Sequence, residues 1–223
     1  MFKDSKKKYE VVRQAISYEL ANFIFNYFLL HREATAFLLK QQIISDTLQN
    51  LWGTWKDPQA PNTFSKYGDG VMETLLMRTL PMMSKLTGLN LIPCYAYARI
   101  YKKGDILARH KDRNSCETSC TINLGGDPWN IFIDPSGKTS VKKSISKNKV
   151  ILKKRPAKGI PILLKPGDMM VYCGQHIEHW RKPFKGNICA QLFLDYNNKD
   201  GPYGQENFYD GRPVLGIPKI RPR

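Results

Sequence analysis

The sequence predicts an α+β fold in which N-terminal helices pack on one face of a β-sandwich or jelly roll. Apolar residues recur every three or four positions through the first third of the chain, which is the period of a helix. From about residue 91 they alternate instead, in short runs separated by Gly, Pro and Asp, as strands and their turns do. Helices followed by short strands favour an α+β domain, and 223 residues suit one domain with a sizeable core.

The first helix is predicted over residues 9–43, and Asp4 or Ser5 is suited to cap its start. Its apolar positions at helical spacing are Val12, Ile16, Leu20, Phe23, Ile24, Tyr27 and Phe28. Residues 46–69 are rich in Gly, Pro, Asp and Asn, so we expect them to be irregular.

A second helix is predicted over residues 70–87. Asp69 precedes it and is a favourable N-cap residue, whereas Pro81 can bend the helix in its interior. We therefore expect residues 1–90 to form a mainly helical support for the rest of a single domain, residues 1–223.

The remainder of the chain is expected to be mostly β-structure. Residues 94–101 alternate so that four side chains share one face of a strand: Tyr95, Tyr97, Arg99 and Tyr101. Further strands are predicted at 118–124, 129–134, 169–173 and 188–196, and a hairpin with an exposed lysine-rich arm at 139–165. Residues 91–197 would then form the β core, and residues 198–223 an irregular C-terminal wrap.

The chain is strongly basic, with 35 Lys and Arg against 19 Asp and Glu, a formal net charge of +16. Such an excess attracts polyanions, so nucleic acid is one partner class, and a basic surface without a dedicated partner is the alternative. Lysines gather in three places, Lys6 to Lys8, Lys142 to Lys165 and Lys219 to Arg223. The central run could guide a polyanion, or it could form a solvated edge that prevents association between sheets.

The cysteines indicate a reducing compartment. There are five, an odd number without paired spacing, which argues against a disulfide framework, and no second pair completes a zinc knuckle. The first residues lack the apolar core of a signal peptide, and no apolar run is long enough to span a bilayer. We expect a cytoplasmic protein that does not bind membranes, and no pattern in the sequence identifies an oligomeric state.

The stretch His110-Lys111-Asp112 is the first candidate metal-binding motif. Residues two apart on a strand project from the same face, so this imidazole and carboxylate can approach one metal ion. A third ligand would come from His176 or His179, whereas His31 lies in a helical pattern and is expected to be structural. Two histidines and one carboxylate leave three positions open, which suits Fe(II) that activates oxygen, while zinc more often takes three histidines or cysteines. An isolated His-x-Asp, however, is usually a surface turn.

The context of that motif resembles a known family, the prolyl 4-hydroxylase-like 2-oxoglutarate oxygenases. The segments that carry the resemblance are Tyr101-Lys-Lys-Gly104-Asp-Ile-Leu107-Ala-Arg-His110-Lys-Asp112, Pro166-Gly-Asp-Met-Met-Val-Tyr172 and His179-Trp-Arg-Lys-Pro183-Phe-Lys-Gly186. They cover roughly residues 95–196 in the family's order. The spacing of Pro183 and Gly186, with the glycine shifted by one residue, favours His179 over His176 as the distal ligand. The resemblance implies a double-stranded β-helix, and Fe(II) and 2-oxoglutarate as cofactors, with ascorbate as an accessory reductant.

The sequence departs from the family where the far carboxylate of 2-oxoglutarate would bind. The family places a Lys or Arg about ten residues beyond the distal histidine, but this region contains no cation, and Leu107 stands where a tyrosine usually helps. Arg181 lies two residues beyond His179, so on a strand it would point the same way and could form a bidentate pair with a carboxylate. A salt bridge at the rim is the alternative role for Arg181. Arg113 and Lys185 are weaker candidates.

Two roles are open to Tyr101 by its position: contact with 2-oxoglutarate or burial in the core. The resemblance as a whole implies a dioxygenase that hydroxylates a peptidyl proline or another protein side chain, with His110, Asp112 and His179 at the catalytic iron. Two alternatives follow from the charge. One is an oxygenase that acts on nucleic acid, and the other is a non-catalytic basic β-sandwich that binds nucleic acid or an acidic protein.

Overall fold

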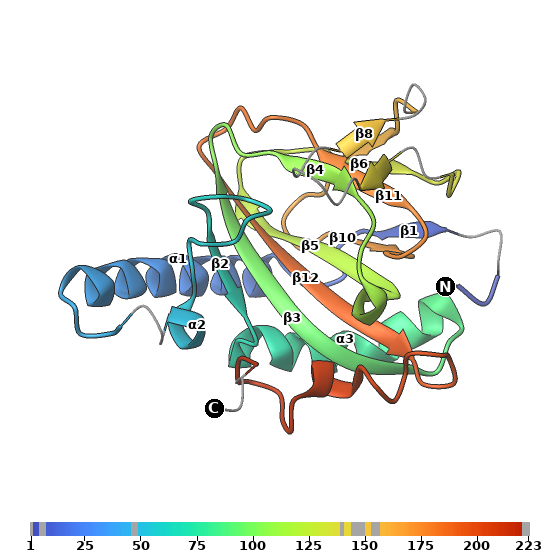
Figure 1. Cartoon of the computed structure of the whole chain (residues 1–223), viewed down its shortest axis with the longest axis horizontal. Helices are drawn as coiled ribbons and strands as arrows, with labels where there is room; N and C mark the ends of the chain where they lie inside the picture. Colours follow the sequence, from blue (N-terminus) through green and yellow to red (C-terminus); the bar gives the residue numbers. More distant parts are fainter. Residues whose placement is uncertain are drawn as a thin grey trace.

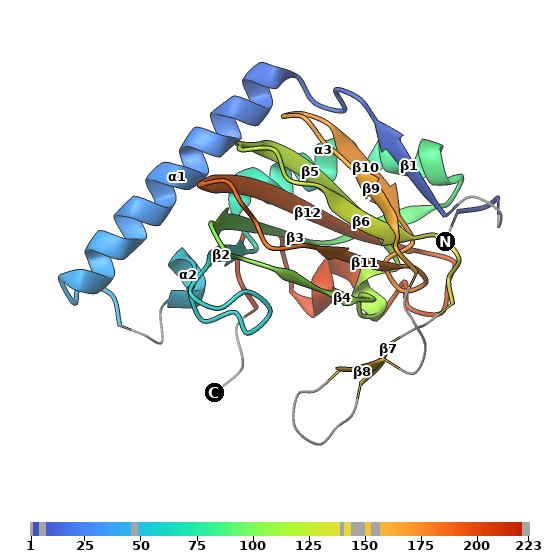
Figure 2. The same ribbon diagram turned by 90° about the horizontal axis from the view of Figure 1, so that it is seen from above.

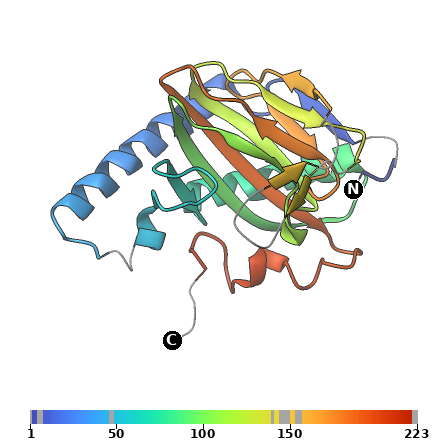
Figure 3. The same ribbon diagram turned by 45° about the horizontal axis from the view of Figure 1, so that its top comes forward.

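Two antiparallel sheets lie face to face in the computed structural model, which describes residues 2–4, 8–45, 49–138, 141–143, 150–152 and 157–219 (Figure 1, Figure 3). The larger sheet has six strands in the order β1 (Tyr9–Val12), β10 (Met169–Tyr172), β5 (Thr118–Gly126), β12 (Ile188–Asn198), β3 (Leu91–Lys102) and β2 (Phe64–Tyr67). The smaller sheet has the order β4 (Leu107–His110), β11 (Glu178–Arg181), β6 (Ile131–Asp134) and β9 (Ile160–Ile162). Two facing antiparallel sheets of this kind make a jelly roll, as the sequence predicts.

Helices α1 (Tyr18–Lys40) and α3 (Gly70–Thr87) cover the outer face of the six-stranded sheet (Figure 2). Each begins at a side chain that accepts from the first free N–H groups: Ser17 caps α1, and Asp69 caps α3 as predicted. Pro81 lies inside α3, which continues through it. The shorter elements are α2 (Gln49–Trp52) and the 3-10 turns η1 (Asn114–Cys116) and η2 (Phe208–Gly211).

Alternation along β3 divides its side chains between two environments. Ala96, Ala98 and Ile100 are buried in the main hydrophobic core, between the sheet and the helices. The intervening residues are those that the sequence places on one face, and three of them line a cavity between the sheets: Tyr95, Tyr97 and Arg99. The small alanine side chains allow α3 to pack closely on one face, and the polar face is left for the interior of the jelly roll.

The prediction of one helix over residues 9–43 is wrong at its start. Residues 9–12 form β1, which pairs with β10, and the helix begins only at Tyr18. The cap is therefore Ser17 rather than Asp4, while Ser5 lies outside the described residues. A strand partner about 160 residues away overrides the helical periodicity of this segment.

The expected irregular segment 46–69 contains the α2 turn and the edge strand β2. The predicted hairpin is present as β7 (Val141–Lys143) and β8 (Val150–Leu152), but Ile160–Ile162 leaves it and pairs with β6 as β9. Residues 139–140, 144–149 and 153–156 of the arm lie outside the described residues, as do 5–7 and 220–223 at the basic ends. The role of these lysines stays a prediction.

The described part of the C-terminal segment runs along the body and is attached by a buried ion pair (Figure 1). Arg212 donates to both carboxylate oxygens of Glu73 on α3, at 2.6 and 3.2 Å, and to the carbonyls of Cys94 and Ile217. Both side chains are buried. Among the described residues, no helix combines the length and apolar character that crossing a bilayer requires.

Candidate metal centre

Three predicted ligands converge between the two sheets. His110 ends β4 and lies directly opposite His179 of β11 in the antiparallel register, and Asp112 follows two residues after His110. Asp112 Oδ1 is 3.4 Å from His110 Nε2 and 3.3 Å from His179 Nε2. One donor atom from each residue lies within 4.8 Å of the others, which is the separation of ligands around one ion. Within the described ranges this is the group of three that could hold a metal, and His176 is not part of it.

Backbone carbonyls orient both imidazoles. His110 Nδ1 lies 2.7 Å from the carbonyl oxygen of Ala108, and His179 Nδ1 lies 3.4 Å from that of Ile177. Because a carbonyl only accepts, a proton on each Nδ1 would be donated there, and each Nε2, which faces Asp112 Oδ1, would then be the atom that binds a metal ion. This donor set of two imidazoles and one carboxylate fits Fe(II) with three positions left open.

The carboxylate of Asp112 is held in its charged form. Burial alone would raise the pKa of Asp112, but His179 and His110 outweigh that effect and hold the pKa well below its usual range. The reverse applies to His179: burial lowers its pKa, the Asp112 charge raises it, and the net direction is upward. The site therefore supplies the negative charge that a dication requires.

Two residues that the sequence analysis did not identify hold Asp112 in place. Ser119 donates from Oγ to Asp112 Oδ2 at 3.3 Å, and the Asp112 N–H donates to the carbonyl of Gly174 at 2.9 Å. A Cβ atom at position 174 would lie only 2.4 Å from Asp112 Oδ2, so the carboxylate needs glycine there. The only sequence signal for Gly174 is its place directly after a predicted strand.

A cavity of about 390 Å³ opens beside the three ligands. Its lining is rich in aromatic side chains, namely Tyr67, Tyr95, Tyr97, Tyr172 and Phe193. The charged lining residues other than the ligands are Asp57, Arg99, Lys111, Arg113 and Asp195. Aromatic walls with a few fixed polar groups are typical of ligand sites.

The loop after α2 contributes to one wall of this cavity. Asp57 accepts hydrogen bonds from Tyr97 and Arg99, which hold the pKa of Asp57 below its ordinary value against the opposing effect of burial. Gln59 accepts from Arg99 at 3.2 Å and directs its amide nitrogen to His110 Nε2 at 3.1 Å. Residues from a predicted irregular segment therefore reach the metal centre, which composition alone does not indicate.

Asp195 of β12 is a second carboxylate close to the centre. It is buried, and the single hydroxyl proton of Ser119 lies between the two carboxylates, with Oγ 2.7 Å from Asp195 Oδ1 and 3.3 Å from Asp112 Oδ2. Burial, followed by the charge of Asp112, raises the pKa of Asp195 to about 7.

Arg181 is the predicted carboxylate-binding cation that is buried in the interior. Its side chain is 1% exposed, donates to the carbonyl of Trp129 at 2.7 Å and to Gln191 Oε1 at 3.0 Å, and its Nε has no hydrogen-bond partner. Burial lowers the pKa of Arg181, and no acidic group forms an ion pair with it among the described residues. Leu107, its partner in the β4–β11 register, lines the cavity.

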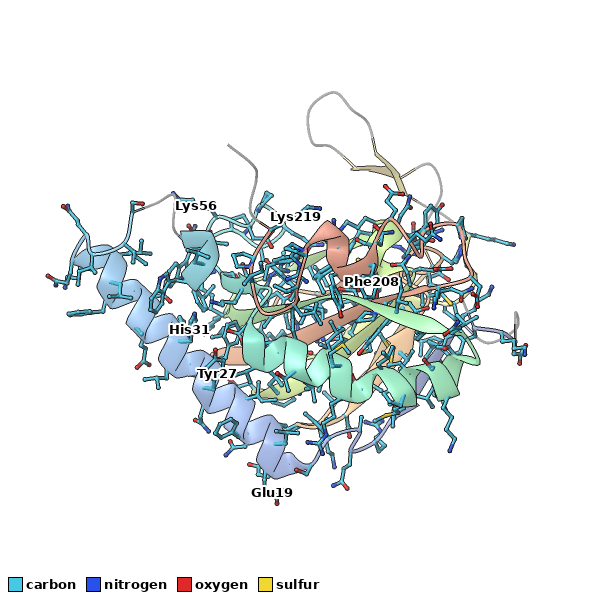
Figure 4. All side chains as sticks on the ribbon, turned by 90° about the horizontal axis from the view of Figure 1, so that it is seen from below. Glu19, Tyr27, His31, Lys56, Phe208 and Lys219 are labelled. Atoms are coloured by element: carbon cyan, nitrogen blue, oxygen red, sulfur yellow. The ribbon has the colours of Figure 1, made fainter. Side chains whose placement is uncertain are left out.

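The other candidates for that role occupy different surroundings. Tyr101 is fully buried, accepts from Arg99 at 3.0 Å and packs edge-on against Trp129. Arg113 is half-exposed and pairs with Asp210 at 3.1 Å, and Lys185 is exposed. His31, labelled on α1 in Figure 4, stacks on Trp52 of α2 and is not part of the ligand group, which agrees with a structural role.

Comparison with solved structures identifies the fold. A prolyl-4-hydroxylase from Pseudomonas putida aligns over 86% of this chain and 92% of its own, at 13% identity and a TM-score of 0.52. HygX from Streptomyces hygroscopicus, solved with nickel and 2-oxoglutarate bound, aligns over 87% and 84% at 12% identity and a TM-score of 0.58. The viral collagen prolyl hydroxylase vCPH from Paramecium Bursaria Chlorella virus-1 aligns over 85% and 96% at 12% identity, with a TM-score of 0.51.

The chain has the fold of the 2-oxoglutarate oxygenases. No protein-family model matches the sequence, and no curated protein sequence is similar to it. At identities this low the likeness establishes the architecture, and it confirms the double-stranded β-helix with helices on one face that the sequence predicts. The chemistry of the chain is inferred from the residues of its site.

Proposed function

We propose that the protein is an Fe(II)- and 2-oxoglutarate-dependent dioxygenase that hydroxylates a peptidyl proline or another protein side chain. The observation that carries the proposal is the convergence of His110, Asp112 and His179, with both Nε2 atoms directed at Asp112 Oδ1, in the fold that binds 2-oxoglutarate in similar structures. When bound, Fe(II) would activate oxygen while 2-oxoglutarate is oxidised to succinate and CO2. The chain's own residues would hold the ion and orient the cosubstrate.

Arg181 is the residue we assign to the far carboxylate of 2-oxoglutarate. A guanidinium that is fully removed from water is unfavourable unless an anion compensates it, and this one has only neutral acceptors among the described residues. Its unpartnered Nε leaves a donor for a carboxylate oxygen. Gln191 of β12 accepts from the guanidinium, so the cation stands on β11 in the four-stranded sheet, whereas the position usual in the family falls on β12 in the facing sheet. Tyr101 and Arg113 remain secondary candidates.

The cavity favours a protein substrate over nucleic acid. Besides the histidines, its lining carries three acids, Asp57, Asp112 and Asp195, and three bases, Arg99, Lys111 and Arg113. Two of these bases form ion pairs with acids, Arg99 with Asp57 and Arg113 with Asp210. A cavity balanced in charge and walled by aromatic rings suits a peptide with a neutral side chain better than a phosphate backbone.

The decisive assay measures succinate formed from 2-oxoglutarate under air with added Fe(II). We expect turnover in the parent protein, none in His110→Ala, and unchanged turnover in the matched control His176→Ala, because His176 is outside the ligand group. Anaerobic addition of Fe(II) and 2-oxoglutarate should also produce the weak visible charge-transfer band of a chelated cosubstrate. A folded, iron-loaded protein that shows neither result contradicts the proposal.

The assignment of Arg181 has its own test. In Arg181→Leu we expect the KM for 2-oxoglutarate to rise by about 100-fold, the loss of a charge-assisted bidentate pair, while Fe(II) affinity changes little. The control Lys185→Leu, an exposed cation four residues further on, should keep the parent KM. An unchanged KM in Arg181→Leu would show that another cation binds the far carboxylate of 2-oxoglutarate.

The substrate class can be tested with peptides and oligonucleotides in one format. We expect proline-containing peptides to gain the mass of one oxygen atom in a 2-oxoglutarate-dependent manner, and oligonucleotides to remain unmodified. Oxidation of an oligonucleotide rather than a peptide would favour the alternative function, an oxygenase that acts on nucleic acid.

We also propose a cytoplasmic location, because all five cysteines are buried and free, as in a reducing compartment.

A further inference from the structure

Helix α1 presents a second apolar face that the fold does not cover. Phe23, Leu30 and Phe37 are 63%, 67% and 58% exposed. They are spaced by seven residues, so all three project within about 40° of one another around the helix. The buried residues of the helix project from the opposite side and are Ala21, Ile24, Phe28 and Thr35. Single exposed apolar residues are ordinary, but these three at heptad spacing form a stripe about 21 Å long, in which Asn26 and Ala34 lie between them.

The surroundings leave this stripe accessible over its whole length. Figure 2 shows α1 along the outer edge of the molecule, with the sheets on one side only, and in Figure 1 its C-terminal end extends past the sheets. The sequence pattern places Phe23 and Ile24 together among the apolar positions of the helix, but Ile24 is buried whereas Phe23 is exposed. Apolar residues repeated every seven positions are the pattern of a helix that packs along another helix.

The stripe is complementary to itself when two copies run antiparallel. If Leu30 packs against the partner's Leu30, residues whose numbers sum to 60 face each other. Phe23 then meets the partner's Phe37 at both ends, and Asn26 meets the partner's Ala34, a small side chain that leaves room for the helices to approach. A two-fold axis through Leu30 therefore relates the two copies, and each large residue of the stripe contacts a large residue of the partner.

Charge at the two ends of α1 selects the antiparallel orientation. Glu19, labelled in Figure 4, lies in the first turn and Lys40 in the last. Neither forms an ion pair within the part of the chain that the structure describes. An antiparallel pair brings each Glu19 beside the partner's Lys40 and opposes the two helix dipoles. A parallel pair would place like charges together at both ends.

We infer that α1 is the contact helix of a homodimer, in which two copies pair antiparallel about Leu30. The paired face is opposite the one that packs on the sheet, so assembly leaves the metal centre unchanged. The inference is independent of the proposed function, because it depends on none of the metal ligands.

Sedimentation equilibrium of the full chain over a range of concentrations tests the association. We expect a dimer for the parent protein and a monomer for Leu30→Glu, which places two carboxylates on the symmetry axis. Met77→Glu is the matched control, since Met77 is an apolar residue of α3 that is 43% exposed and lies outside the stripe; this variant should remain dimeric. Circular dichroism should show all three proteins folded. A monomeric parent, or a dimer unaffected by Leu30→Glu, overturns the inference.

Disulfide trapping tests the orientation. All five native thiols are buried, so an introduced surface cysteine can be oxidised selectively. Leu30→Cys should cross-link with itself, Phe23→Cys alone should not, and a mixture of Phe23→Cys and Phe37→Cys should form the mixed dimer. Self-cross-linking of Phe23→Cys would indicate a parallel pair and overturn the antiparallel assignment.

Discussion

Close packing against Asp112 makes Gly174 the most restrictive position around the metal centre. In Gly174→Ala, the added methyl group would overlap with the Asp112 carboxylate, the Cys116 carbonyl and Ser119 Oγ. We expect Fe(II) affinity to fall by about 10-fold or more, as it does when a group that positions a metal ligand is disturbed. Metal titration should show this loss. Gly70→Ala is the control, because a Cβ there meets nothing within 4 Å, and an equal loss in both variants would contradict the explanation.

Asp195 makes stability depend on pH in a definite direction. Because its folded-state pKa of about 7 is above the usual value for an aspartate, the charged form destabilises the fold at higher pH, and the penalty disappears as pH falls to about 4. Asp195→Asn keeps an acceptor for Ser119 and removes the charge. We expect it to raise the free energy of unfolding by roughly 1 to 3 kcal/mol at about pH 8 and to change it little at about pH 4. Denaturant unfolding with chelator present measures the free energy of unfolding at both pH values. An increase in stability at the low pH only would show that the predicted direction of the pH dependence is wrong.

The sequence predicts the candidate ligands but not their supports. His110 and Asp112 are predicted from their spacing on a strand, and His179 from the resemblance to a known family; the structure brings the three together. Gln59 and Ser119 reach the same place through folding of distant segments, and their residue types are common everywhere in proteins. Arg181 is predicted only in part. Alternation along a strand predicts which way its side chain points, but not that the side chain is buried.

Elements with internal signals are predicted well, and those that depend on a distant partner are not. The helix α3 carries its own cap at Asp69 and its own periodicity, and its predicted bounds of 70–87 match the structure. The edge strand β1 has no such signal, because it exists through pairing with β10, and the helical spacing continues through it. Long-range pairing is the information that a local pattern lacks.

The ion pair between α3 and the C-terminal segment should be essential for attaching that segment. Arg212→Met leaves the buried Glu73 carboxylate without its cation, which we expect to cost about 3 kcal/mol of unfolding free energy. Arg32→Met is the control, because the Arg32–Glu33 pair is exposed at 3.8 Å and should contribute less than about 1 kcal/mol. Thermal or denaturant unfolding compares the two. Similar losses would show that burial of the Glu73 pair is unimportant.

Over the whole molecule, the charge excess and the cavity are separate features. The chain carries a net charge of +16, from 35 basic and 19 acidic residues, whereas the charged residues that line the cavity balance. The excess must therefore lie outside the cavity. A charge distributed in this way attracts polyanions without directing them to the metal.

This separation predicts how the protein binds nucleic acid. We expect a short single-stranded oligonucleotide to bind without sequence preference at low salt and to be released steeply as salt rises, because binding depends on counterion release. His110→Ala and Arg181→Leu should bind it as the parent does, since neither side chain is on the outer surface. Fluorescence anisotropy at a series of salt concentrations measures the slope. Binding that resists salt, or that weakens in His110→Ala, would place nucleic acid in the cavity and make it a candidate substrate in place of a peptide.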